Sequence, residues 1–114
     1  MPNQLHQSRQ FAFNRQGGKC FYCGLRMWLN GQSGPPQMRC TAEHLTARCE
    51  GGDNGRSNIV AACWHCNHTR HKCKRPLDPL RYQAKVRRRL ARGAWLPRCV
   101  IEWSRSSRPG KEER

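Results

Sequence analysis

The chain has 114 residues and a mass of 13.3 kDa, the size of one small domain and too short for two cores of ordinary size. Only 36% of its residues are apolar, so we expect a source of stability besides hydrophobic burial. Lysine and arginine number 22 against 7 acidic residues, which gives a net charge of +15. This excess is larger than solubility requires and favours a polyanionic partner, nucleic acid before an anionic membrane.

The apolar stretches of the chain argue against a membrane or secreted protein. The longest uncharged apolar stretch, 59–64, is far below the roughly 18 residues that a membrane span needs. The first ten residues lack the apolar run of a secretory signal. We therefore predict a cytoplasmic protein without membrane association, and we read its eight cysteines first as thiolates and only second as disulfides.

The first third of the chain is predicted to hold one helix and one strand. A short helix over 5–16 is ended by Gly17 and Gly18. A tight turn at 20–24 precedes a short strand over 25–29. The composition of 30–37, NGQSGPPQ, is typical of a loop.

The middle of the chain is predicted to form a strand pair followed by helices. Strands over 39–46 and 58–62 flank a wide, glycine-containing turn at 48–57. A helix over 64–74 is expected to stop near Pro76. The strongest helical pattern covers 80–92, which is rich in helix formers.

Four cysteines have the spacing of a closed zinc site. Cys20 and Cys23 form one C-x2-C pair, and Cys63 and Cys66 form another. Zinc bound here would supply the missing stability, on the order of 10 kcal/mol of apparent folding energy. A rival ligand set combines the second pair with His68 or His71 and leaves the first pair idle. The other cysteines read as buried small side chains or bystanders; they are Cys40, Cys49, Cys73 and Cys99.

A second group of residues carries the features of a hydrolytic site. Glu43 precedes His44, and Asn58 follows fifteen residues after Glu43. Asn67 comes directly after the last paired cysteine, with His71 one helical turn later. Residues four apart share one face of a helix. A strand could therefore offer a carboxylate and an imidazole, and a helix an amide oxygen and a second imidazole.

At this point the sequence resembles the HNH endonucleases, the His-Me finger proteins of the four-cysteine zinc type. The matching stretches are GGKCFYCG and CTAEHLTARCEGGDNGRSNIVAACWHCNHTRHK, which lie within 17–72 and agree in order and spacing. The resemblance implies an α+β fold, a small zinc-stapled ββα-metal domain with flanking N-terminal and basic C-terminal helices. We expect one HNH domain over 1–104, with a core at 17–74 and a basic helical extension at 76–104. Residues 105–114 are expected to be a disordered tail.

The resemblance also implies a role for each site residue. His44 matches the general base, and Glu43 matches a ligand of the catalytic metal. Asn58 matches the asparagine that pins the turn so that His44 is correctly aimed. Asn67 matches the third motif position, a metal ligand. His71 matches a place where some members, the colicin nucleases among them, carry a metal-binding histidine and many four-cysteine members carry lysine.

Elementary chemistry agrees with these roles. Histidine titrates near pH 6.5, so at neutral pH it can take a proton from water. Hard oxygen ligands such as those of Glu43 and Asn67 favour Mg²⁺ or Mn²⁺; His71 would extend the range to other divalent ions. A metal there would act as a Lewis acid on the phosphate and the leaving oxygen. Asparagine at the third motif position, Asn67, makes the sequence an H-N-N variant of the family motif. The adjacent His68 is a substitute metal ligand, although we favour a solvent-facing position for it.

The C-terminal half carries the strongest positive charge. Between Arg70 and Arg98 stand eleven lysines or arginines and one acid, Asp78, which favours a phosphate-binding face. Trp95 and Trp103 are read as core residues before base-stacking residues. The predicted nucleic-acid contacts are Arg70, Lys72, Lys74, Arg87, Arg88, Arg89 and Arg92.

These observations predict a metal-dependent endonuclease that hydrolyses DNA. One alternative is a zinc-stapled DNA-binding module without catalysis, which would have no use for the residues around His44. A nuclease directed at RNA is another. The sequence leaves open whether the protein nicks or cuts both strands, and whether it acts as a homodimer or with a partner protein. Small free-standing members of this family are often associated with phages, mobile elements or restriction and defence systems.

Overall fold

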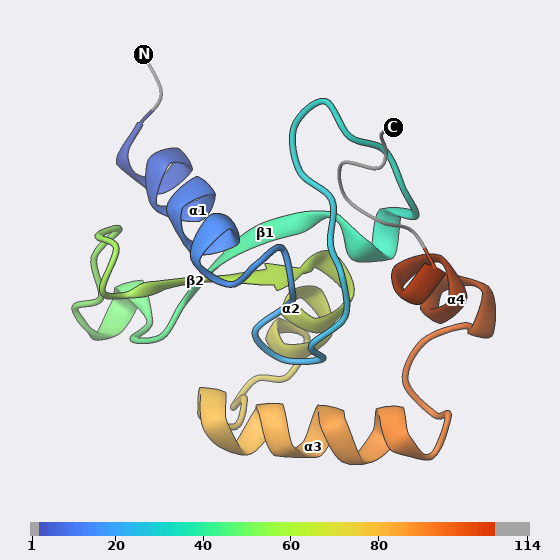
Figure 1. The fold of residues 1–114 in the computed structure, drawn as a ribbon. Helices are drawn as coiled ribbons and strands as arrows, with labels where there is room; N and C mark the ends of the chain where they lie inside the picture. The colour runs from blue at the N-terminus through green and yellow to red at the C-terminus, as the bar shows by residue number, and fades with distance from the viewer. Residues whose placement is uncertain (1–2, 107–114) are drawn as a thin grey trace.

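The computed structural model describes residues 3–106 as a two-stranded antiparallel sheet with helices around it (Figure 1). This confirms the predicted α+β class, in which two strands and the following helix form the ββα unit. The strands are β1 (Cys40–His44) and β2 (Ile59–Cys63), and the helices are α1 (Gln4–Arg15), α2 (Trp64–His71), α3 (Pro79–Ala91) and α4 (Arg98–Ser106). Two short 3-10 helices, η1 (Pro36–Met38) and η2 (Arg48–Glu50), precede and follow β1 in the chain.

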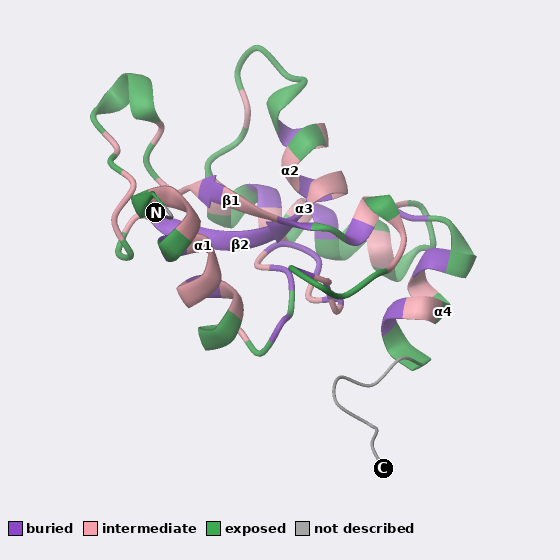
Figure 2. Ribbon diagram, turned by 90° about the horizontal axis from the view of Figure 1, so that it is seen from above, coloured by how far each residue is buried: buried purple, intermediate pink, exposed green. Residues whose placement is uncertain are grey.

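The sheet is covered on both faces. Figure 2 shows α1 on one side of the strands and α2 on the other. All five residues of β2 are buried, which explains why its sequence, IVAAC, is an unbroken apolar run rather than an alternating one. The antiparallel register pairs Glu43 with Val60 and His44 with Ile59. The two central residues of the predicted site therefore lie at the end of β1, beside the β1–β2 loop.

The N-terminal helix is attached to the outer edge of β2. Asn3 caps its first turn by accepting a hydrogen bond from the His6 backbone N–H. At its end, the Gln16 side chain accepts from the Ala61 N–H at 2.9 Å and donates to the Ala61 carbonyl at 2.9 Å. Gln16 thus satisfies the Ala61 N–H, which an edge strand would otherwise leave open, and shares the Ala61 carbonyl with the Phe21 N–H.

Helix α3 packs onto α2 and the turn that carries Cys20 and Cys23, and α4 packs onto the segment that follows this turn. The Tyr82 hydroxyl of α3 donates to the Cys66 carbonyl at 2.7 Å, and Val86 is fully buried. From α4, Ser104 accepts a 2.6 Å hydrogen bond from the Arg26 N–H. These contacts bury the apolar faces of both helices and leave their charged faces exposed.

Three predicted elements need correction. The segment 25–29 is no strand; it makes only isolated bridges, Lys19 to Arg26 and Trp28 to Arg39. Helix α2 ends at His71, three residues early, because the N–H groups of Lys72 and Cys73 bond three residues back and tighten the last turn. Helix α4 lies in the expected basic helical extension at 76–104 but continues through Arg105 and Ser106, so the expected tail at 105–114 is wrong for its first two residues. Its remainder lies outside the described residues.

Within residues 3–106, none of the helices combines the length and the apolar character needed to cross a bilayer.

Candidate functional site

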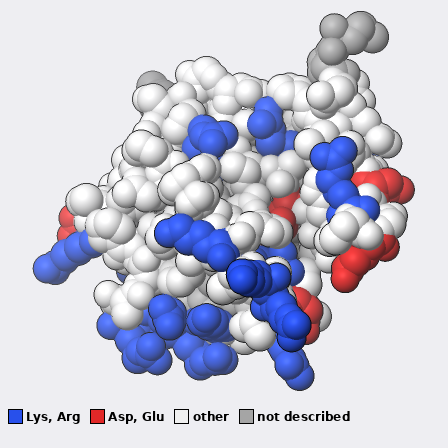
Figure 3. Space-filling model, turned by 180° about the vertical axis from the view of Figure 1, so that it is seen from behind, with Lys and Arg blue, Asp and Glu red and all other residues white. Residues whose placement is uncertain are grey.

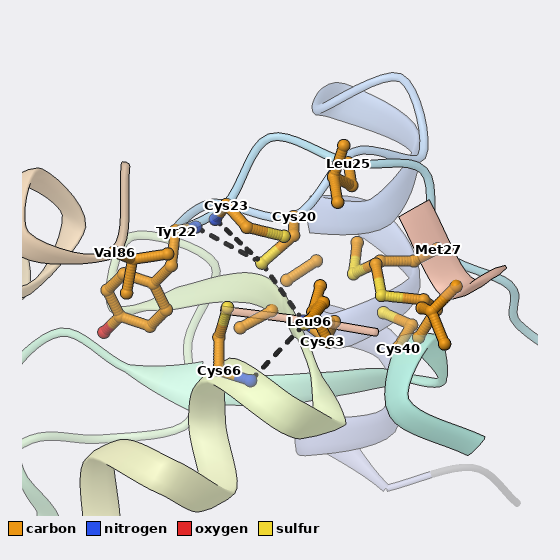
Figure 4. Close-up of a cluster of buried hydrophobic side chains, with 14 of the residues drawn as sticks. Cys20, Tyr22, Cys23, Leu25, Met27, Cys40, Cys63, Cys66, Val86 and Leu96 are labelled. Carbon is orange, nitrogen blue, oxygen red and sulfur yellow. Dashed lines mark hydrogen bonds between the residues drawn. The ribbon is translucent and has the colours of Figure 1, made fainter. Parts of the chain in front are cut away.

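The four paired cysteines meet at one buried point. The sulfur atoms of Cys20, Cys23, Cys63 and Cys66 all lie within 4.8 Å of one another, and each residue is at most 3% exposed. Figure 4 shows these residues together, with Cys40 to one side near Met27. Tetrahedral Zn–S bonds of about 2.3 Å place sulfurs about 3.8 Å apart. The donor set and its spacing therefore fit zinc.

Backbone N–H groups already point at the cysteine sulfurs. The Cys20 sulfur accepts from the N–H groups of Tyr22 at 3.3 Å and Cys63 at 3.2 Å. Trp95 donates its indole N–H to the Cys66 sulfur at 3.3 Å. Burial alone would raise the pKa of the Cys20 thiol, but hydrogen bonds from the neighbouring thiols outweigh it and hold that pKa well below its usual value. Such donors stabilise thiolate, the form that binds a metal.

The remaining cysteines do not join this cluster. Cys40 is buried, and burial raises the pKa of its thiol to about 12, so it behaves as a small apolar side chain. Cys49, Cys73 and Cys99 are exposed. The rival set of zinc ligands, Cys63 and Cys66 with His68 or His71, is not brought together among the described residues. His68 is exposed and its ring stacks on Trp64, with centroids 4.4 Å apart.

A cleft of about 930 Å³ lies beside the sheet and gathers the other predicted residues. Its walls include Glu43 and His44 from β1, and Asn67 and His71 from α2. The fold therefore brings together side chains that lie up to 28 positions apart in the sequence. Two exposed basic residues that follow α2, Lys74 and Arg75, also line this cleft.

His44 is held by a residue that the sequence analysis missed. Its Nε2 lies 2.8 Å from the Oδ1 of Asn54 in the β1–β2 loop. His44 is partly exposed, so its ring is open to the cleft. A hydrogen bond on one ring nitrogen leaves the other nitrogen to act on a ligand.

Asn58 lies at the base of the same loop, as the turn-pinning role requires. Its Oδ1 accepts from the Thr46 N–H at 2.8 Å. Its amide group donates to the Thr46 carbonyl at 3.0 Å and to the Asp53 carbonyl at 2.8 Å. Gly52 packs so closely here that a Cβ would overlap the Thr46 carbonyl oxygen. Asn58 fixes the loop backbone, and none of these three side-chain bonds goes to His44.

The Glu43 carboxylate is almost wholly buried and strongly hydrogen-bonded. Its Oε2 accepts from the Tyr22 hydroxyl at 2.9 Å and pairs with the Arg70 guanidinium at 3.0 Å. Its Oε1 lies 3.0 Å from the Nε2 of His71. Burial, and then the negative charge of Glu43, raise the pKa of Tyr22 above its ordinary range, so Tyr22 stays protonated and remains a donor. The carboxylate is thereby held in one orientation.

The donor atoms around Glu43 fit a divalent ion. Oxygen and nitrogen ligands about 2.1 Å from an octahedral ion are about 3 Å apart at adjacent positions, the separation of Glu43 Oε1 and His71 Nε2. Asn67 donates its amide group to the Thr41 hydroxyl at 2.9 Å. This bond orients the side chain and leaves its amide oxygen as the acceptor for a ligand.

Arg70 does not have the place that the sequence predicts. It was expected to contact nucleic acid, but its side chain is only 9% exposed and is paired with Glu43. Its Nε and Nη2 also donate to the Leu77 carbonyl, at 3.1 and 2.8 Å. The arginine is buried because α2 turns it inward, where it neutralises the buried carboxylate. It therefore contributes to the site rather than to a phosphate-binding face.

The other predicted basic residues are exposed. Lys72 and Lys74 follow α2, and Arg88, Arg89 and Arg92 lie on or at the end of α3. Figure 3 shows lysine and arginine side chains gathered over the lower part of the molecule, where Figure 1 places α3. Arg87 is exposed as well, but its Nε donates to the Tyr22 carbonyl at 2.6 Å, so it also holds α3 against the cysteine turn.

Both tryptophans pack against the core, as the sequence analysis favoured. Trp95 contacts the cysteine cluster through Cys66. Trp103 packs beneath the Arg26 guanidinium, which lies 3.8 Å from its ring centroid. Neither is positioned as a freely exposed stacking platform.

Comparison with known families agrees with this geometry. Residues 20–73 match the family described as HNH endonuclease. This segment, a little under half of the chain, is similar to the HNH endonuclease family. The HNH segment begins at the first cysteine of the cluster and ends just after α2, so it contains the four cysteines and the cleft residues of β1 and α2. No curated protein and no solved structure matches the chain.

Proposed function

We propose that this HNH protein is a metal-dependent endonuclease that hydrolyses DNA phosphodiester bonds. The observation that carries the proposal is the convergence of His44, Glu43, Asn67 and His71 on one cleft inside the segment that matches the family. A base, a carboxylate and an amide oxygen in one cleft are the groups that phosphodiester hydrolysis needs. The large positive charge supports a polyanionic substrate.

His44 serves as the general base in this proposal. Its ring is anchored at Nε2 and open to the cleft, so the second nitrogen can accept the proton of an attacking water. Proton transfer by a positioned side chain contributes roughly 10² to 10⁴ in rate. Asn58 supports the base indirectly, by fixing the loop that carries its hydrogen-bond partner.

Glu43, Asn67 and His71 would hold the catalytic divalent ion, with Mg²⁺ or Mn²⁺ as the ions that oxygen ligands favour. Such an ion supplies Lewis-acid stabilisation of the phosphate and the leaving oxygen. The chain's own contribution is orientation. Tyr22 and Arg70 fix the Oε2 atom of Glu43 and leave its Oε1 atom for the ion.

The four cysteines would hold a structural zinc ion, because closed four-thiolate sites are structural in function. This ion would fix the turn of Cys20 and Cys23 against α2. The same turn carries Tyr22, so the zinc site would also hold the Glu43 carboxylate in place. We further propose that 1–104 acts as one domain, with α3 and α4 as an extension of the HNH core.

Exposed basic side chains near the cleft and on α3 would contact the DNA backbone. Lys74 lines the cleft and Lys72 is exposed just before it in the chain, while Arg88, Arg89 and Arg92 extend the positive surface along α3. Contacts to phosphate oxygens position a protein without reading sequence. We therefore expect low sequence preference.

Plasmid cleavage tests the proposal. Supercoiled plasmid is incubated with the purified protein and excess Mg²⁺, Mn²⁺ or another divalent ion, beside the His44→Ala variant and a chelated control. Metal-dependent conversion to nicked or linear DNA by the wild type alone supports the proposal. Binding without cleavage under every metal would favour the non-catalytic DNA-binding module instead, and cleavage of RNA but not DNA would reassign the substrate.

A further inference from the structure

We propose that Asn54, held in place by Ser8 of α1, fixes the tautomer and the orientation of His44. This inference rests on the proposed nuclease function, because it assigns a positioning residue to the proposed general base. It also gives α1 a role in the site, although α1 lies outside the segment that matches the family.

The contact between Asn54 and His44 defines which ring nitrogen carries the proton. An amide oxygen can only accept a hydrogen bond, and Asn54 Oδ1 lies 2.8 Å from His44 Nε2. The neutral ring must therefore carry its proton on Nε2. Its Nδ1 is left with a lone pair, the form that a general base needs.

Asn54 is itself anchored from outside the loop. The Ser8 hydroxyl donates to the Asn54 backbone carbonyl at 2.6 Å, and Ser8 is only 2% exposed. A second contact joins the same two elements, since the Arg56 guanidinium lies 4.1 Å from the ring centroid of Phe11. Helix α1 thus holds the loop beside the residue that contacts His44.

The loop also has its own internal bonds, but they act elsewhere. Asn58 fixes the base of the loop at Thr46 and Asp53. The Gly55 N–H bonds to the Asp53 side chain at 3.0 Å. None of these bonds involves Asn54, so within the described residues Ser8 makes the hydrogen bond that fixes its backbone from another element.

The direct test observes the His44 tautomer by nitrogen NMR of the full chain labelled with ¹⁵N, with His44→Ala identifying the resonances. Wild type should show His44 protonated on Nε2 at alkaline pH. Asn54→Ala should lose this preference, whereas Asn54→Asp keeps an acceptor and should retain it. Protonation of His44 on Nδ1 in the wild type would overturn the proposal.

Cleavage kinetics provide the second test. Asn54→Ala should lower kcat about 10- to 100-fold and leave KM nearly unchanged. This loss is a part of the rate enhancement that a positioned general base provides. Asn54→Asp, assayed at alkaline pH so that the imidazole is neutral, should recover most of that loss. Ser57→Ala, an exposed change in the same loop, is the matched control and should behave as wild type. A wild-type kcat in Asn54→Ala would contradict the proposal.

The link to α1 is tested with Ser8→Ala, which should reduce kcat and the tautomer preference in the same direction, but less than Asn54→Ala. Gln7→Ala, an exposed neighbour on α1, is the control. If Ser8→Ala changes neither readout, α1 has no part in positioning His44. If the wild type cuts nothing, the proposed function fails, while the NMR spectra still decide whether Asn54 sets the tautomer.

Discussion

Glu43 and His44 are neighbours in the chain but have opposite surroundings. Glu43 is 2% exposed and bonded to three side chains, whereas His44 is partly exposed and anchored at a single ring nitrogen. A buried carboxylate needs partners to offset the loss of hydration. A base needs access to water. The same two-residue motif therefore supplies one rigid group and one accessible group.

At the residue scale, His44→Ala separates catalysis from binding. The change should lower plasmid cleavage by roughly 10² to 10⁴ and leave the zinc content, the folded state and the DNA affinity nearly intact, because among the described residues the ring hydrogen-bonds to Asn54 alone. Cleavage and DNA binding are measured on the same preparations. Cleavage at the wild-type rate would remove His44 as the base.

Glu43→Ala should cost stability as well as activity. Removing the carboxylate leaves Arg70 buried without its partner, and breaking one side of a buried ion pair costs about 3–5 kcal/mol. Thermal unfolding should show a clear fall in Tm. Glu43→Gln keeps an acceptor for Tyr22 and should lose less stability than Glu43→Ala, although its cleavage, even in high Mn²⁺, should stay low. An unchanged Tm in Glu43→Ala would show that the Arg70 pair contributes little.

At the element scale, the β1–β2 loop is shaped by Asn58. Asn58→Ala removes three hydrogen bonds to the loop backbone, so we expect a cleavage defect smaller than that of His44→Ala, with zinc content unchanged. Cleavage rates and zinc content, measured on both variants in parallel, test whether the Asn58→Ala defect is the smaller one. A defect in Asn58→Ala as large as that of His44→Ala would mean that the loop is lost altogether.

The basic face of α3 should bind DNA largely without regard to sequence. Changing Arg88, Arg89 and Arg92 to alanine removes exposed cations and should weaken binding to unrelated duplexes alike. The slope of log K against log salt should become shallower by about 1 for each lost phosphate contact. Arg39→Ala, an exposed arginine outside α3, is the comparison. An unchanged slope in the triple variant would place the DNA elsewhere.

At the scale of the whole molecule, the cysteine cluster joins the turn of Cys20 and Cys23, the end of β2, and α2, with α3 and Trp95 packed against it. We expect one zinc ion per chain, and loss of the folded state in Cys23→Ser, because a three-ligand structural site does not close. Cys99→Ser, at an exposed thiol of α4, should melt as the wild type does. Metal analysis and thermal unfolding test both statements, and a zinc-free folded protein would contradict them.

The positive charge is also a property of the whole chain rather than of one motif. The net +15 is spread over α3, the segment after α2 and the N-terminal elements, while Arg70 is withdrawn from the surface. Burial of one arginine leaves the overall attraction to a polyanion intact, but it changes which residues can contact phosphates. A charge count taken from the sequence cannot make that distinction.

The sequence by itself determined the features that depend on local spacing. The two C-x2-C pairs predicted the cysteine cluster, and the strand candidates at 39–46 and 58–62 predicted β1 and β2 to within two residues at each end. The order of Glu43, His44, Asn58 and Asn67 indicated the family that the comparison then found. Such patterns can be recognised in the sequence because strand periodicity and metal-ligand spacing involve residues that are close together in the chain.

Only the tertiary structure decided which side chains support the residues of the cleft. Asn54, Tyr22 and Ser8 have no motif spacing to Glu43 or His44. Asn54 in the β1–β2 loop bonds to His44, Tyr22 in the cysteine turn bonds to Glu43, and Ser8 of α1 bonds to Asn54. The inward turn of Arg70 likewise depends on a partner 27 residues away. Long-range pairs form because a buried charge or a base needs a partner from whichever element packs nearby. The fold selects that partner, and no local pattern encodes it.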